Sequence, residues 1–127
     1  MATKPEFANK PRQSSAALIF GNTARDGSGM METVFTAGSN GSRLERLRIT
    51  ATTGTTPGMV RLFIHDGVRA RLLEEISVTA VIPSASVKAF RELVTFAGGL
   101  MLPPNHSLRA STHNSEGFHL LAEGGDF

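Results

Sequence analysis

The chain has 127 residues, 40% of them hydrophobic, with 13 basic against 11 acidic side chains and a net charge of +2. It contains no cysteine, which excludes disulfides, thiolate metal sites and cysteine nucleophiles. No apolar run approaches about 18 residues, so no membrane-spanning helix is expected. The polar start of the chain does not resemble a secretory signal. The length suits one domain, and the near balance of charge makes nucleic acid an unlikely partner.

Residues 1–14 differ from the rest of the chain. They combine Pro5, Pro11 and a lone Phe7 with polar neighbours and show no hydrophobic period. This composition predicts an N-terminal arm, followed by a single domain over residues 15–127. Two interpretations of the arm stay open: a terminal tail without fixed structure, or an extended segment that becomes ordered on a partner.

Short apolar runs separated by turn residues begin after the arm. The first three lie at 16–20, 31–37 and 42–53, with Gly- and Asn-rich turns between them. In the third run Leu47, Ile49 and Ala51 alternate with polar residues, which is the period of a strand with one buried face. Leu44 is out of phase with this set, so a β-bulge is expected near Glu45.

The central part of the chain predicts a hairpin. Asp66-Gly67 separates the runs 59–65 and 68–78, and both turn residues tolerate a positive φ. Leu73 breaks the alternation, and residues 72–76 also fit a helical turn; the Thr and Val content of the following residues favours a strand.

The remaining runs are less regular. Residues 87–96 fit a helix or a strand, and a strand over 91–96 is the preferred interpretation. Further short runs lie at 100–102, 107–113 and 118–123. Eight or nine such runs at regular spacing indicate an all-β fold. We expect a two-sheet antiparallel sandwich of jelly-roll type with about eight strands.

The sequence does not predict an enzyme. His113, Glu116 and His119 lie around one expected turn, but they match no metal-ligand spacing, and solvent-exposed polar positions are the simpler interpretation. No nucleophile elbow, zincin or phosphate-loop motif occurs. We therefore expect no catalytic residue, no metal and no cofactor.

Basic residues are concentrated in the first part of the chain. Residues 1–71 hold ten basic and five acidic side chains, whereas residues 72–127 hold three and six. Arg46 and Arg48 share one face of an expected strand, and Arg61 is expected beside them across a hairpin. Three interpretations stay open: a solvated face that opposes aggregation, a contact with an acidic protein or with another copy, and, with less support, nucleic acid.

Residues 31–127 resemble small structural proteins of tailed bacteriophages. The likeness lies in the turn 37–42 leading into a strand with Leu47-Arg48-Ile49, in the hairpin segment 60–67, and in the late Leu-Pro-Pro-Asn-His-Ser-Leu-Arg and Glu-Gly-Gly-Asp-Phe segments. It is a likeness of pattern and contains no catalytic motif.

This resemblance implies a non-enzymatic virion protein, specifically a capsid decoration or cement protein. Such a protein would be made in the bacterial host cytoplasm, form a homotrimer, and bind the major capsid protein at capsomer junctions, where it stabilises the head. No membrane partner is expected. A tail-fibre or baseplate module that binds a receptor or glycan is the alternative. The candidate partner-binding residues are Lys4, Phe7, Lys10 and Arg12 in the arm, with Arg46, Arg48 and Arg61 as second choices.

Overall fold

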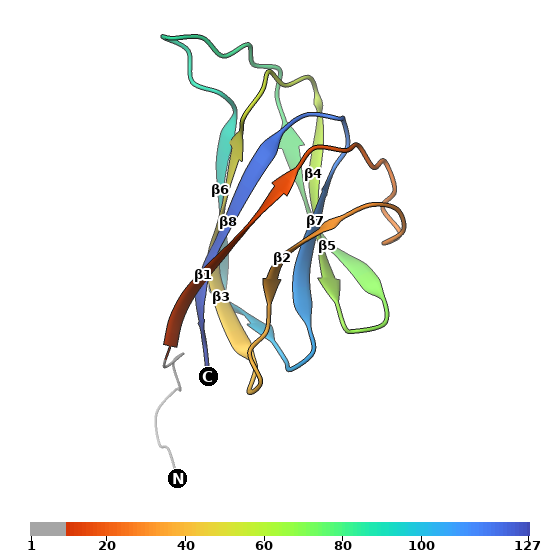
Figure 1. Ribbon diagram of the computed structural model, residues 1–127, viewed down its shortest axis with the longest axis vertical. Helices are drawn as coiled ribbons and strands as arrows, with labels where there is room; N and C mark the ends of the chain where they lie inside the picture. The colour runs from red at the N-terminus through yellow and green to blue at the C-terminus, as the bar shows by residue number, and fades with distance from the viewer. Residues whose placement is uncertain (1–9) are drawn as a thin grey trace.

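The computed structural model describes residues 10–127, which fold into an all-β sandwich of two antiparallel four-stranded sheets (Figure 1). The strands are β1 (Lys10–Leu18), β2 (Glu32–Thr36), β3 (Ser42–Ala51), β4 (Gly58–His65), β5 (Ala70–Val78), β6 (Arg91–Leu102), β7 (Ser107–Thr112) and β8 (Phe118–Asp126). The first sheet has the order β1-β8-β3-β6 and the second the order β2-β7-β4-β5. The predicted sandwich of about eight strands is therefore confirmed.

The strands pair in a nested pattern. The first strand pairs with the last, the second with the seventh, the third with the sixth, and the fourth with the fifth. The chain thus resembles one long hairpin folded over itself, with its turn at Asp66-Gly67, where Gly67 has a φ of +98°. This pattern is compatible with the jelly-roll type expected from the sequence.

Alternating side chains from both sheets form the core, because successive residues of a strand point to opposite faces. In β3, for example, Leu47, Ile49 and Ala51 are buried and the residues between them are exposed. Nineteen hydrophobic residues are buried, and Phe90 meets Phe118 edge to face, with ring centroids 6.4 Å apart. Burial of this apolar surface is the main stabilising contribution to the sandwich.

Two irregularities in the hydrophobic pattern are β-bulges. The register of β3 shifts between Leu44 and Arg46 against both of its neighbours, as the phase change at Leu44 predicts. The register of β4 against β5 shifts at Leu62, so Leu73 is the extra residue of a strand and not part of a helical turn.

The structure corrects two of the predicted boundaries. β1 begins at Lys10 and pairs with β8 from its first residue, so residues 10–14 belong to the sandwich and not to the arm. Residues 1–9 lie outside the described part of the chain. β1 also ends at Leu18, before the predicted end of its run, and leaves Ile19 and Phe20 exposed. Over 10–127, no helix has the length and hydropathy needed to cross a bilayer.

Candidate binding surface

The outward-facing residues of the first sheet form a surface that we call the basic face. The register of β1, β8, β3 and β6 places them in three rows across the sheet. The rows are Ala17–His119–Thr50–Arg91, then Ser15–Leu121–Arg48–Leu93, then Gln13–Glu123–Arg46–Thr95. Three arginines and one carboxylate therefore share this face with exposed aliphatic side chains.

The arginines of the basic face differ in their partners. Arg48 Nε donates a hydrogen bond to Glu123 Oε1 at 2.6 Å, and this contact is the main reason why the pKa of the Glu123 carboxyl lies below its ordinary value. Arg46 lies close enough to add a Coulombic effect on the same carboxyl. Within residues 10–127, Arg46 and Arg91 make no side-chain hydrogen bond or ion pair. Their guanidinium groups remain available to carboxylates of another molecule.

The basic face contains shallow, open depressions. One of about 510 Å³ lies over β1, β8 and β3, where Ala17, Leu121 and the stem of Arg48 contribute to its walls. A second, of about 340 Å³, lies beside it, between Gln13, Arg46 and neighbouring residues. Leu93 on β6 is 51% exposed, although large aliphatic side chains are usually buried. The first depression has mainly aliphatic and cationic walls, whereas the second also contains the carboxylates of Glu45 and Glu123. Open depressions of this kind suit contact with another protein.

Arg12, a predicted arm contact, instead ties the two sheets together. Its guanidinium group forms a bidentate ion pair with Asp126, with Nη2–Oδ1 and Nε–Oδ2 distances of 2.9 and 3.0 Å. It also donates to the carbonyl oxygen of Thr36 and stacks 4.0 Å from the centre of the Phe35 ring. Arg12 and then Ser42, which donates to Asp126 at 2.6 Å, hold the pKa of this carboxyl below its ordinary value. These contacts join β1 and β8 to β2.

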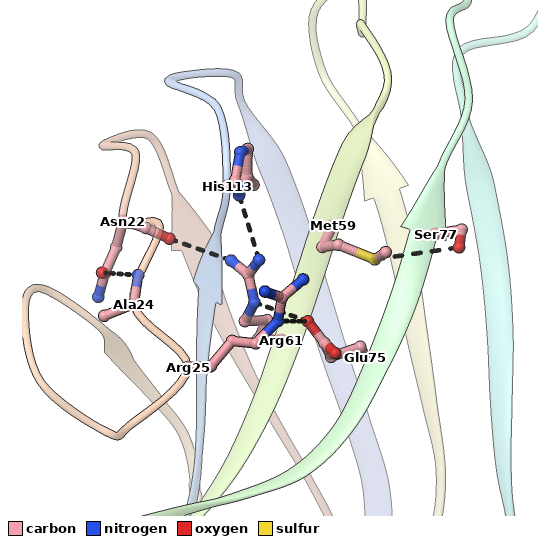
Figure 2. A network of polar contacts seen from close by, with 8 residues as sticks. All are labelled: Asn22, Ala24, Arg25, Met59, Arg61, Glu75, Ser77 and His113. Carbon is pink, nitrogen blue, oxygen red and sulfur yellow. Dashed lines mark hydrogen bonds and ion pairs between the residues drawn. The ribbon is translucent and has the colours of Figure 1, made fainter.

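Arg61 is fully buried, so its predicted role as an exposed contact is wrong. Figure 2 shows its polar contacts with Asn22, Glu75 and His113. It lies on β4 in the second sheet, where the segment between β1 and β2 covers the outer side of the strand. Its Nε donates to Glu75 at 2.9 Å, and its two terminal nitrogens lie 3.3 Å from the carbonyl oxygen of Asn22 and 3.1 Å from His113 Nδ1. Arg25 also donates to Glu75, at 2.8 Å. Arg25 first, and Arg61 second, lower the pKa of the Glu75 carboxyl.

The expectation that Arg61 lies beside Arg46 and Arg48 fails because β3 and β4 belong to different sheets. Period-2 alternation assigns a residue to a face of its own strand, but it does not tell which sheet the strand joins. Nor does it show that a loop will cover the outer face of that sheet.

The other predicted contacts fall in different places. Lys10 is exposed at the start of β1, opposite Asp126. Lys4 and Phe7 lie outside the described residues. Only Arg46 and Arg48 lie together as expected. The sequence analysis missed Arg91 and Leu93, because residues 87–96 carried no clear period, and the register with β3 is what brings these two side chains to the basic face.

The three residues considered as metal ligands serve other contacts or none. Glu116 accepts hydrogen bonds from the backbone nitrogen and the hydroxyl of Thr56, each at 2.8 Å, while His113 contacts Arg61. His119 points outward on the basic face. Over residues 10–127, no group of three His, Cys, Asp or Glu side chains could hold a metal ion.

Comparison with known proteins assigns the chain to no family. No protein-family model matches the chain, and no curated protein matches it. Among solved structures, the chain is similar to a chain in the structure of infectious bursal disease virus, Gx strain, with a TM-score of 0.37 and 12% sequence identity. That match covers 98% of this chain and 35% of the viral one, so the chain spans about a third of that protein's length.

Proposed function

We propose that the chain is a non-enzymatic structural protein of a virion that acts by binding other proteins. The observation that carries this proposal is the basic face, an exposed sheet surface. Within residues 10–127 the guanidinium groups of Arg46 and Arg91 have no ion-pair partner there, and the exposed Leu93 lies in the row between them. A surface of this kind offers charge complementarity and apolar contact to a partner.

The internal polar contacts support the same proposal. The other arginine clusters are engaged within the sandwich: Arg12 with Asp126, and Arg61 with Glu75. These ion pairs fasten strands and a loop to one another. Their arrangement suits a rigid module whose outer face makes the functional contacts.

The specific role that we propose is capsid decoration. A homotrimer would bind major capsid subunits at capsomer junctions and would stabilise the head, because a ligand that binds only the assembled state shifts the equilibrium towards assembly. Many weak contacts, repeated around the shell, would act together through multivalency. The virion is therefore the proposed location of the protein.

Electron cryomicroscopy of virions produced with and without this chain tests the proposal. We expect additional density of sandwich size at capsomer junctions only in virions that contain the chain. Virions lacking it should lose DNA at a lower temperature. Density confined to the tail would favour the tail-fibre or baseplate alternative, and identical particles would contradict any structural role.

A further inference from the structure

We propose that the basic face binds an extended acidic segment of its partner with the pattern Asp/Glu-x-Leu-x-Asp/Glu. This inference rests on the proposed function and adds the chemistry of the partner. It is drawn from the cross-strand register, which places Arg46 and Arg91, both without an ion pair in the part of the chain that the structure describes, on either side of an aliphatic row.

The spacing of the cations defines the length of the segment. Arg91 pairs with Thr50, which lies four residues beyond Arg46 on β3. With roughly 3.3 Å per residue along a strand and about 4.8 Å between strands, the two arginine positions are about 14 Å apart. Residues i and i+4 of an extended peptide are about 13 Å apart and point to the same side. Carboxylates at these two positions would therefore reach Arg46 and Arg91 together.

The row between the two cations is aliphatic. Leu121 and Leu93 lie on either side of Arg48 in this row, and the guanidinium group of Arg48 is already engaged by Glu123. The hydrocarbon stem of Arg48 adds to the apolar surface between them. Residue i+2 of the extended segment would lie over this row, and an aliphatic side chain there would cover surface that is now exposed to water.

The same composition argues against a nucleic acid or a sulfated glycan as the ligand. Single-stranded nucleic acids use aromatic side chains for base stacking and a continuous basic track for phosphates. The three rows of the basic face hold no Phe, Tyr or Trp and only one imidazole, His119, and the two leucines interrupt the cations. A protein segment with alternating carboxylate and aliphatic side chains matches both parts of the surface.

A peptide titration followed by NMR of the full chain tests the inference. The probe is a synthetic peptide with the core Glu-Thr-Leu-Thr-Glu flanked by serines. We expect it to shift the signals of Arg46, Leu121 and Arg91. Peptides with Gln for Glu, or with Ala for Leu, should bind several-fold more weakly. Equal binding of either control peptide, or tighter binding of dextran sulfate or of a DNA oligonucleotide, would overturn the inference.

Matched charge reversals locate the binding site. The double variant Arg46→Glu/Arg91→Glu should weaken peptide binding about tenfold, since each exposed ion pair contributes a few-fold. Arg69→Glu, an exposed arginine at the β4–β5 turn of the other sheet, should change it less than about twofold. Equal effects of the two changes would refute the site. Unaltered thermal unfolding of all three proteins shows that their fold is kept.

Binding to virions separates this inference from the proposed function. If virions bind the wild-type chain and the double variant equally well, the inference fails and the virion role stands. If the peptide binds the basic face but virions do not bind the chain, the virion role fails, and the acidic-segment site stands as a property of the surface.

Discussion

Arg61 is completely buried in the sandwich, and its charge is paired with the carboxylate of Glu75. Its guanidinium group contacts the carboxylate of Glu75, the carbonyl oxygen of Asn22 and the ring nitrogen of His113. The buried charge therefore has polar partners on three sides. Burial of an ion pair adds little net stability by itself. Glu75 is 28% exposed and also accepts from Arg25, so loss of Arg61 would not leave it as an isolated buried charge.

Arg61→Met should lower the free energy of unfolding by about 1–3 kcal/mol, since it leaves the carbonyl oxygen of Asn22 without its side-chain donor and removes one hydrogen bond to Glu75. Glu75 would keep Arg25, which limits the loss. Arg25→Ala is the control, because its side chain is 61% exposed; it should cost less than about 1 kcal/mol. Urea unfolding followed by circular dichroism is suitable, since the chain has no Trp or Tyr. Equal losses of unfolding free energy in the two variants would mean that the buried Arg61 stabilises the fold no more than the exposed Arg25 does.

Asp126 should make the stability of the sandwich depend on pH. Arg12 and Ser42 lower its pKa in the folded state below the ordinary value of 3.8. The resulting stabilisation is complete above that value and is lost as the pH falls through the lower folded pKa. Asp126→Asn should therefore reduce stability at pH 7 and flatten its decline between about pH 5 and pH 2.

A double-variant cycle with Arg12→Gln checks the origin of this pH dependence. Because both changes break the same ion pair, while each also removes a contact of its own, the loss of stability in the double variant should be clearly smaller than the sum of the two single losses. Fully additive losses would show that Arg12 and Asp126 act separately.

Among the elements, β1 shows how a strand can be concealed in a polar sequence. Residues 10–14 contain Pro11, Arg12 and three further polar residues, and they lack an apolar period. They are nevertheless paired, because the partner strand β8 supplies the register and Arg12 reaches Asp126 and Phe35. Such partners are distant in sequence, so local patterns cannot reveal them.

Two truncations should separate the arm from this strand. Deletion of residues 1–14 removes five paired residues of β1 and the Arg12–Asp126 ion pair, and should lower the melting temperature by roughly 10 °C. Deletion of residues 1–9 leaves every described contact in place. It should therefore shift the melting temperature by less than about 2 °C. If Lys4 and Phe7 add to the contact that the basic face makes, as the sequence predicts, the shorter deletion should weaken virion binding. Unchanged binding would contradict that role.

The close approach of β8 to β3 depends on Gly124. A Cβ there would collide with the carbonyl oxygen of Arg43 at the bulge. Gly124→Ala should cost about 1–3 kcal/mol of stability, as overpacking does. Gly54→Ala is the matched control, since its nearest neighbour, the carbonyl oxygen of Val81, would lie at 3.5 Å; it should be neutral. A neutral Gly124→Ala would mean that the two strands can separate without loss.

At the scale of the whole molecule, the sequence predicts where the strands lie along the chain better than it predicts which strands pair with each other. The hairpin at Asp66-Gly67, the bulge near Glu45 and the strand over 91–96 are all recoverable from local patterns. The assignment of β3 and β4 to different sheets cannot be predicted from local patterns, because it depends on pairing with strands far along the chain. The position of Arg61 was mispredicted for this reason, and Arg91 and Leu93 were overlooked.

The central claim is that the basic face is the surface that contacts the virion, and site-specific photo-crosslinking tests it most directly. A photoreactive amino acid would replace Thr95 on the basic face or, as the control, Ser77 on the exposed side of β5 in the second sheet. Each protein is irradiated on virions and the crosslinked partner is identified by mass spectrometry. We expect crosslinks to a capsid subunit, near an acidic and aliphatic segment, from position 95 and few or none from position 77. Crosslinks from position 77 alone would contradict the account.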